Sequence, residues 1–363
     1  MPNYFAPAFQ VYIDGNKLAA DVSKHIQQVS VSLQKDLMDT FTLTVANAYP
    51  KLQWTHTKDA ELFKEASSVR IAFGYVDDLH ELISGEITTI SPSFPESGMP
   101  TLSIEGQTLL HRLSESKKTR TFQKMTDQQM VQQIAADLNL KVKADDTGTQ
   151  YDYVMQNNQT DLEFLSGRAE RIRFEVLVQD NTLLFRKPPE ESAKVYTLIW
   201  GHTQASFAGG PNTLPLKKFG TQLNLKSQVN EVTVRGYDPA TKKTIIGRAG
   251  QGSEAVRMNG KKTGAEIAKS AFQRTREHVR VNVPVASQDE ADQHAKAIYN
   301  QHAMELLTGS GSTIGVPDLK PGNVVDLQGL GDRFSGFYYV TQATHAIGSG
   351  GYSTDFSVER GDA

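Results

Sequence analysis

Residues Leu82–Gln107 read LISGEITTISPSFPESGMPTLSIEGQ, and residues Phe334–Gly361 read FSGFYYVTQATHAIGSGGYSTDFSVERG. Both stretches open near a Ser-Gly pair, carry a second Ser-Gly pair in the middle, and close on an apolar-Ser-apolar-Glu segment. Those closing segments, Leu102–Glu105 and Phe356–Glu359, have the alternation of a half-buried β-strand. A central Ser-Gly pair supplies the left-handed backbone that a tight reversal needs. We therefore predict the same β-hairpin at both places.

The segments that precede each hairpin also correspond. Both halves show a predicted hairpin of two alternating strands, then a connection, then a further strand. These segments are residues 27–34, 40–47 and 69–75 in the first half, and residues 220–227, 230–237 and 323–330 in the second. The repeated order predicts two related, mostly antiparallel domains, each a small closed or nearly closed β-barrel.

The segment between the predicted barrels has a different character. Two capping boxes, Thr126 with Gln129 and Thr160 with Glu163, each precede an amphipathic helical pattern. A two-strand pattern follows, with its turn at residues 180–181. Residues 110–190 are therefore predicted to be an inserted α+β domain.

The chain as a whole is predicted to be a β-rich α+β protein with two tube-like antiparallel β-barrel domains. The first barrel domain is residues 1–109, and the second is residues 191–363. The second contains a helical insertion at about residues 260–310, where Thr263 and Ser287 each stand three residues before a glutamate. The longer of these helices is expected to pack on the second barrel through Ala291, Ala295 and Ile298.

Composition excludes several classes of protein. The chain has 38 basic and 41 acidic residues, a net charge of -3, so it lacks the basic excess that binds a nucleic-acid backbone. It has no cysteine, which excludes disulfides and thiolate metal sites. No apolar run reaches the ~20 residues of a membrane-spanning helix, and the N-terminus lacks a secretory signal pattern. We expect synthesis in a cytoplasm and no membrane insertion.

No motif predicts an active site. The nine histidines show no H-E-x-x-H spacing, and the pair His294 and His302 fits a polar helix edge. There is no G-x-S-x-G elbow and no phosphate-binding loop. The glycine-rich segments 247–252 and 309–315 are interpreted as flexible loops. We predict no catalytic residue, no metal ligand and no cofactor, and therefore no enzyme.

Several stretches resemble the phage late control D protein family, which includes baseplate hubs of contractile tails and the hub part of valine-glycine repeat spike proteins. The resemblance is dense from about Tyr4 to Lys187, and QNNQTDLEFLSGRA (156–169) is its most specific element. Other stretches that carry it are 85–113, 118–140, 153–178 and 317–345.

The resemblance implies two tube-type barrels in one chain and a homotrimer with pseudo-sixfold symmetry. Such a ring would join a hexameric inner tube to a separate trimeric spike and contact other baseplate proteins. The protein would be made in a bacterial cytoplasm and assembled into the baseplate of a phage or phage-tail-like contractile injection particle. The chain ends after the predicted second barrel, so we expect the spike to be another polypeptide.

Within this interpretation, Ser97 and Gly98 in the first hairpin and Ser349 and Gly350 in the second are candidate contacts to neighbouring subunits, tube or spike. One alternative is a cell-wall hydrolase at the tail tip, which would need paired carboxylates within residues 110–190. Another is a carbohydrate-binding module, which would need grouped exposed aromatic residues. Trp54 and Trp200, the two tryptophans, lie in different segments.

Overall fold

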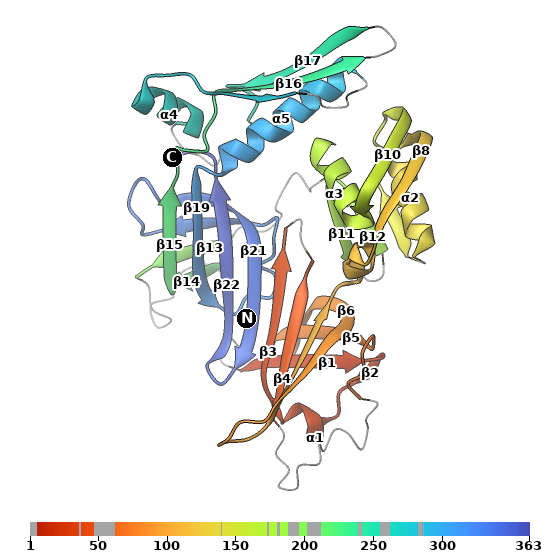
Figure 1. Cartoon of the computed structure of the whole chain (residues 1–363). Helices are drawn as coiled ribbons and strands as arrows, with labels where there is room; N and C mark the ends of the chain where they lie inside the picture. The colour runs from red at the N-terminus through yellow and green to blue at the C-terminus, as the bar shows by residue number, and fades with distance from the viewer. Residues whose placement is uncertain are drawn as a thin grey trace.

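The computed structural model of the chain describes residues 6–35, 38–46, 62–138, 140–172, 174–179, 182–187, 196–201, 212–238, 242–254, 262–281, 285 and 287–363 (Figure 1). A 14-stranded sheet dominates it, with an insert of mixed structure in each half of the chain. The prediction of a β-rich α+β protein is confirmed. No helix within these residues is long and apolar enough to cross a membrane.

The first half of the sheet is formed by the N-terminal segment. Its strands are β1 (Pro7–Ile13), β2 (Asn16–Lys17), β3 (Ile26–Gln34), β4 (Thr40–Ala46), β5 (Ser68–Tyr75), β6 (Asp78–Ser93) and β7 (Thr101–Gln107), with α1 (Ala20–Ser23) between β2 and β3. Hydrogen bonding places them in the order β3-β4-β7-β6-β5-β1-β2.

The second half repeats this order. Its strands are β13 (Tyr196–Trp200), β14 (Thr213–Leu216), β15 (Lys218–Leu223), β19 (Leu307–Ile314), β20 (Val324–Gln328), β21 (Gly336–Gly348) and β22 (Gly351–Arg360). The order β15-β19-β22-β21-β20-β13 matches β3-β4-β7-β6-β5-β1 strand for strand. The hairpins β6–β7 and β21–β22 occupy equivalent positions, so the prediction of one hairpin used twice is confirmed.

The predicted hairpin of residues 220–227 and 230–237 is wrong. β15 pairs instead with β19, and residues 224–306 lie between these two strands. The predicted loop at 309–315 is therefore mostly strand β19. Its glycines have a packing role, because a Cβ on Gly309 would lie 2.8 Å from the Phe219 ring and one on Gly311 would lie 2.7 Å from the Phe356 ring.

The two halves form one continuous sheet, and no closed barrel is present among the described strands, so the predicted pair of closed or nearly closed barrels is not confirmed. To close the first half into a barrel, the outer edge of β3 would have to pair within that half. It pairs instead with β21, where Val29 lies opposite Ile347 and Gln34 lies opposite Gln342. β21 is 13 residues long, so it pairs with β20 along its first part and with β3 along its second.

Two hydrophobic cores lie against the sheet. The first contains Phe41, Ile71 and Phe73 from the first half, but also Ile347 and Tyr352 from the second. The second core draws its buried residues from the second half alone. The hairpin β21–β22 therefore completes the first core as well as its own.

A buried hydrogen-bond network fixes this shared hairpin. His345 Nε2 lies 3.1 Å from the carbonyl of Leu319, so this nitrogen carries the proton and Nδ1 accepts. Nδ1 lies 3.1 Å from the Tyr352 hydroxyl and 3.2 Å from that of Thr354. From the first half, Tyr75 donates to the carbonyl of Gly315 at 2.8 Å. Burial lowers the pKa of His345 to about 3, so the ring is neutral.

The first insert follows β7. It comprises the 3-10 helix η1 (Leu109–Ser114), β8 (Lys117–Thr126), α2 (Asp127–Asp137), β9 (Lys141–Ala144), β10 (Gln150–Thr160), α3 (Asp161–Ile172), β11 (Glu175–Gln179) and β12 (Thr182–Arg186). Strands β8 and β10 form a ribbon, and β11, β12 and β9 form a small sheet. Both predicted capping boxes are formed, at Thr126 and at Thr160.

The second insert comprises β16 (Glu231–Asp238), β17 (Lys243–Gly250), α4 (Gly264–Phe272), β18 (Glu277–Arg280) and α5 (Gln288–Met304). The face of α5 with Ala291, Ala295 and Ile298 is buried as predicted, but it packs on the β16–β17 sheet and not on the second half of the main sheet. The Ser287 hydroxyl caps α5 by accepting from the Glu290 N–H, while the Glu290 carboxylate reaches Arg171 of α3 at 3.8 Å.

Candidate functional surface

One face of the main sheet is polar across both halves. A row of directly opposed residues crosses five neighbouring strands from β19 to β4. The row consists of Ser312, Asp355, Thr344, Ser32 and Thr40. A second row consists of Ser353, Ala346, Ser30, Thr42, Glu105 and Thr89. The opposite face carries the two cores, so this pattern follows from alternation along each strand.

The seam between the two halves is part of this polar face. The hydroxyl of Ser32 on β3 accepts from Gln342 Nε2 at 3.3 Å and lies 3.2 Å from the hydroxyl of Thr344. A shallow groove of about 240 Å³ lies beside it, between Lys218 on β15 and Thr344 on β21. Hydroxyl and amide groups dominate the surface, with carboxylates at Glu105 and Asp355.

The candidate contact residues lie at the turns of the two equivalent hairpins. Ser97 and Gly98 are exposed between β6 and β7, and Ser349 and Gly350 are exposed between β21 and β22. The register places both turns at one end of the sheet, while the two inserts leave from the other end (Figure 1). No contact between the two turns themselves is found among the described residues.

The backbone of the two turns differs. Gly98 has φ +98°, as a tight reversal requires. In the second turn the left-handed position is Gly351, with φ +88°, and not the predicted Gly350. Large apolar side chains, Phe94 and Met99, are exposed beside the first turn.

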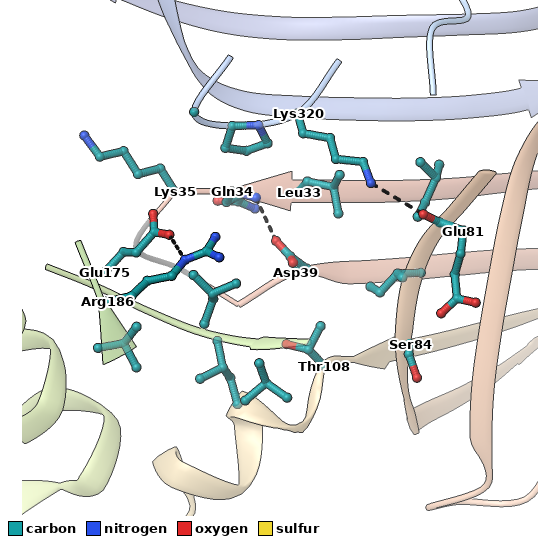
Figure 2. A pocket seen from close by; sticks show the side chains of 18 of the residues that line it. Leu33, Gln34, Lys35, Asp39, Glu81, Ser84, Thr108, Glu175, Arg186 and Lys320 are labelled. Atoms are coloured by element: carbon teal, nitrogen blue, oxygen red, sulfur yellow. Dashed lines mark hydrogen bonds and ion pairs between the residues drawn. The ribbon is translucent and has the colours of Figure 1, made fainter. Parts of the chain in front are cut away.

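A cavity of about 600 Å³ lies where the first insert meets both halves of the sheet (Figure 2). Asp39 faces it and accepts from the backbone N–H of Gln34 at 2.8 Å. Burial raises the pKa of Asp39 to about 6, against smaller opposing effects of the Gln34 N–H and of Lys320. Glu175 and Arg186 form an ion pair of 2.7 Å on one wall.

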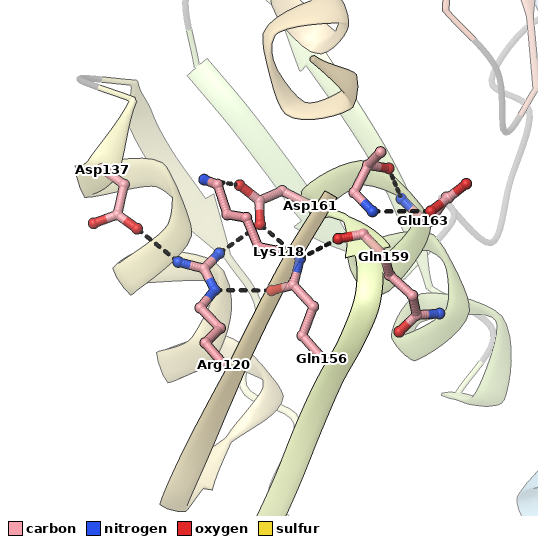
Figure 3. Close-up of polar contacts among 8 residues, drawn as sticks. Lys118, Arg120, Asp137, Gln156, Gln159, Asp161 and Glu163 are labelled. Carbon is pink, nitrogen blue, oxygen red and sulfur yellow. Dashed lines mark hydrogen bonds and ion pairs between the residues drawn. The ribbon is translucent and has the colours of Figure 1, made fainter. Parts of the chain in front are cut away.

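The acidic residues of the first insert are engaged in structural contacts. Asp161 is buried and accepts from Lys118 at 2.7 Å, Arg120 at 2.5 Å and Gln156 at 2.9 Å (Figure 3). Arg120 also pairs with Asp137 at 2.7 Å. These bonds join the start of α3 to the end of α2 and to the β8–β10 ribbon.

No group of three or more histidine, aspartate or glutamate side chains within the described ranges has the arrangement of a metal site. His294, on α5, is half-buried, and its pKa is lowered to about 4 by burial and by Arg171, Arg280 and Arg168. Trp200 is exposed at the end of β13, while Trp54 lies outside the described residues.

The fold is that of phage tail proteins. The 43 kDa tail protein of prophage MuSo2 from Shewanella oneidensis is similar, with a TM-score of 0.70 and 15% identity over 98% of this chain and 99% of that one. A tail protein from Neisseria meningitidis MC58 has a TM-score of 0.69 and 14% identity over 98% and 97%. The E. coli c3393 protein, a component of the type VI secretion system, has a TM-score of 0.53 and 13% identity over 96% and 76%.

The chain belongs to the Alg8 N-terminal domain family, whose sequence profile matches residues 6–349. This differs from the late control D family indicated by the resemblance, so that assignment remains part of the proposal below. Comparison with curated protein sequences gave no match.

Two features of the surface were missed from the sequence. The β3–β21 seam joins residues more than 300 positions apart, and nothing in either strand identifies its partner. The cavity is lined by segments from both halves of the sheet and from the first insert, and it likewise has no local signature. The alternation of Ser and Thr in the strands did indicate the polar face, but not its continuity across both halves.

Proposed function

We propose that the chain is a structural, non-enzymatic hub protein of a phage tail or phage-tail-like contractile injection system. In this proposal three copies form a pseudo-sixfold ring that joins the hexameric inner tube to a separate trimeric spike, as the late control D resemblance implies. The proposed domains are residues 1–109 and 191–363 for the two tube-like units and 110–190 for the first insert.

The repeated strand order is the observation that carries the proposal. One chain contains two half-sheets with the same strand order, so a trimer would contain six. Such a ring could bind a sixfold partner on one side and a threefold partner on the other. The shared fold with tail proteins from two bacteria and with a type VI secretion component supports the same class of role.

The two ends of the sheet suggest separate partners. The hairpin turns at Ser97–Gly98 and Ser349–Gly350 recur with the pseudo-sixfold repeat and would contact tube, spike or neighbouring subunits. The inserts at the opposite end are not repeats of each other and would contact other baseplate proteins. The polar face would line the channel of the ring, where a hydrated surface allows passage without strong binding.

Light scattering of the purified chain over a concentration series tests the trimer. We expect a mass near three times 40.0 kDa. A monomer at every concentration, including in the presence of inner tube and spike proteins, would contradict the ring.

The hairpin contacts need a separate test. The double variant Ser97→Arg/Ser349→Arg is expected to lose co-sedimentation with the inner tube protein while its unfolding midpoint is unchanged, since both positions are exposed. Asp152→Arg, an exposed position on β10, is the matched control. Equal co-sedimentation of both variants would show that the turns do not contact the tube.

A further inference from the structure

The cavity between the first insert and the main sheet has features that the hub proposal does not use. Four consecutive residues of β11, Glu175–Val178, line it. Side chains of successive strand residues point to opposite faces of a sheet. If every residue of a strand lines a cavity, the edge of that strand must therefore face the cavity. β11 pairs with β12 on one side only.

The open edge of β11 can be assigned to particular residues. The register pairs Gln179 with Thr182, so the paired ends of β11 and β12 are two residues apart in the sequence. In such a hairpin the residues that flank the loop exchange hydrogen bonds, and every second pair does so. The N–H and C=O groups of Val176 and Val178 therefore point away from β12. Within the described residues they make no hydrogen bond to another segment.

A second unsatisfied group lies in the same wall. Thr108 is 3% exposed and lines the cavity, and its hydroxyl has no hydrogen-bond partner among the described residues (Figure 2). It precedes η1 at the position where a threonine hydroxyl ordinarily caps a helix, yet it makes no such bond here. A buried hydroxyl without a partner is destabilising, and a ligand that bonds to it would remove this destabilisation.

Most of the charged groups of the walls have an ionic partner. Arg186 pairs with Glu175 at 2.7 Å, and Arg70 pairs with Glu81 at 3.6 Å. Lys35 pairs with Glu359 outside the lining at 3.5 Å, and Lys320 is the opposite charge that acts on Asp39. The other lining side chains are uncharged. They include the apolar residues Leu33, Leu82, Ile83, Leu110 and Pro321 and the polar residues Gln34, Ser84, Thr108 and Tyr339.

We propose that this cavity binds an extended, uncharged peptide segment of another polypeptide, which adds as a strand to the edge of β11 at Val176 and Val178 and bonds to the Thr108 hydroxyl. Main-chain pairing supplies affinity in this mode of recognition, and the pockets for alternate side chains supply specificity. The volume of about 600 Å³ lies within the range of ligand sites. The proposal goes beyond the hub function and stands without it.

Hydrogen exchange of the full chain provides the test. The probes are a library of acetyl-capped pentapeptide amides built from Val, Leu, Thr, Ser and Gly, with N-methylated copies as controls that cannot pair as strands. We expect at least one library member to slow exchange of the amides of Val176 and Val178, and its N-methylated copy to have no effect. Protection by none of the library, or equal protection by the N-methylated copy, would overturn the proposal.

Two variants separate binding from folding. Thr108→Val is expected to retain or raise the unfolding midpoint, because it removes an unpaired buried hydroxyl, and to weaken peptide binding about 3–10-fold, the effect of one hydrogen bond. Ser84→Trp, on the opposite wall, is expected to block binding by filling the cavity. A lower midpoint for Thr108→Val shows that the hydroxyl already has a structural partner and overturns its role. Tighter binding of a probe such as acetyl-ETKTE-amide overturns the uncharged ligand class.

Discussion

The two halves of the sheet have the same strand order but different degrees of independence. β1 pairs antiparallel with β5 in the first half, whereas the equivalent strand β13 pairs in parallel with β20. The first core requires Ile347 and Tyr352 from the hairpin of the other half, while the second core requires no buried residue from the first. The second half therefore completes the core of the first.

The largest expected effect tests this dependence directly. Tyr352 packs edge-on against Phe73 at 5.5 Å and lies against the first core, so Tyr352→Ala is expected to cost about 3–5 kcal/mol of unfolding free energy. Tyr352→Phe removes only the hydroxyl bond to His345 and is expected to cost about 1 kcal/mol. Denaturant titration measures both values.

Hydrogen exchange of the Tyr352→Ala variant shows where the loss occurs. We expect β5, in the first half, to lose more protection than β20, in the second. The reverse order would mean that the first half folds independently of the shared hairpin.

The next effect is pH-dependent and arises in the second half. His345 is neutral in the folded state because burial lowers its pKa from 6.5 to about 3. Below pH 6.5 the unfolded chain therefore binds a proton that the folded chain excludes. The stability contributed by this group is complete above pH 6.5 and is lost as pH falls toward 3, with a slope of up to about 1.4 kcal/mol per pH unit. The variant His345→Gln should show a smaller change of unfolding free energy with pH between pH 6.5 and 3. An unchanged slope would mean that His345 does not cause this pH dependence.

The smallest effects distinguish the two turns. Gly98→Ala is expected to cost about 1 kcal/mol, because φ +98° is strained for alanine, although nothing lies within 4 Å of the added Cβ. Gly350→Ala should change stability by less than about 0.5 kcal/mol, whereas Gly351→Ala, at φ +88°, should resemble Gly98→Ala. Thermal unfolding of the three variants ranks them. Equal costs at Gly350 and Gly351 would show that the second turn is formed differently.

Local patterns in the sequence predicted much of the architecture. The capping boxes at Thr126, Thr160 and Thr263 are formed where they were expected, because a cap depends on residues three positions apart. The alternation in β7 and β22 also places Ile104 and Val358 in the cores as predicted. The predictions that failed involve pairing partners. The sequence pattern pairs β15 with β16, the next strand along the chain, whereas its partner in the structure is β19, which follows the second insert.

The sequence by itself determined the duplicated hairpin, the starts of the helices and which side of each strand is buried, since these depend on neighbouring residues and on a period of two. Only the tertiary structure decided that β21 would pair with β3, that Tyr352 would complete the first core, and that the edge of β11 and the Thr108 hydroxyl would face one cavity. Each of these depends on free energy shared between segments far apart in the chain, and strand edges offer the same backbone groups to every possible partner.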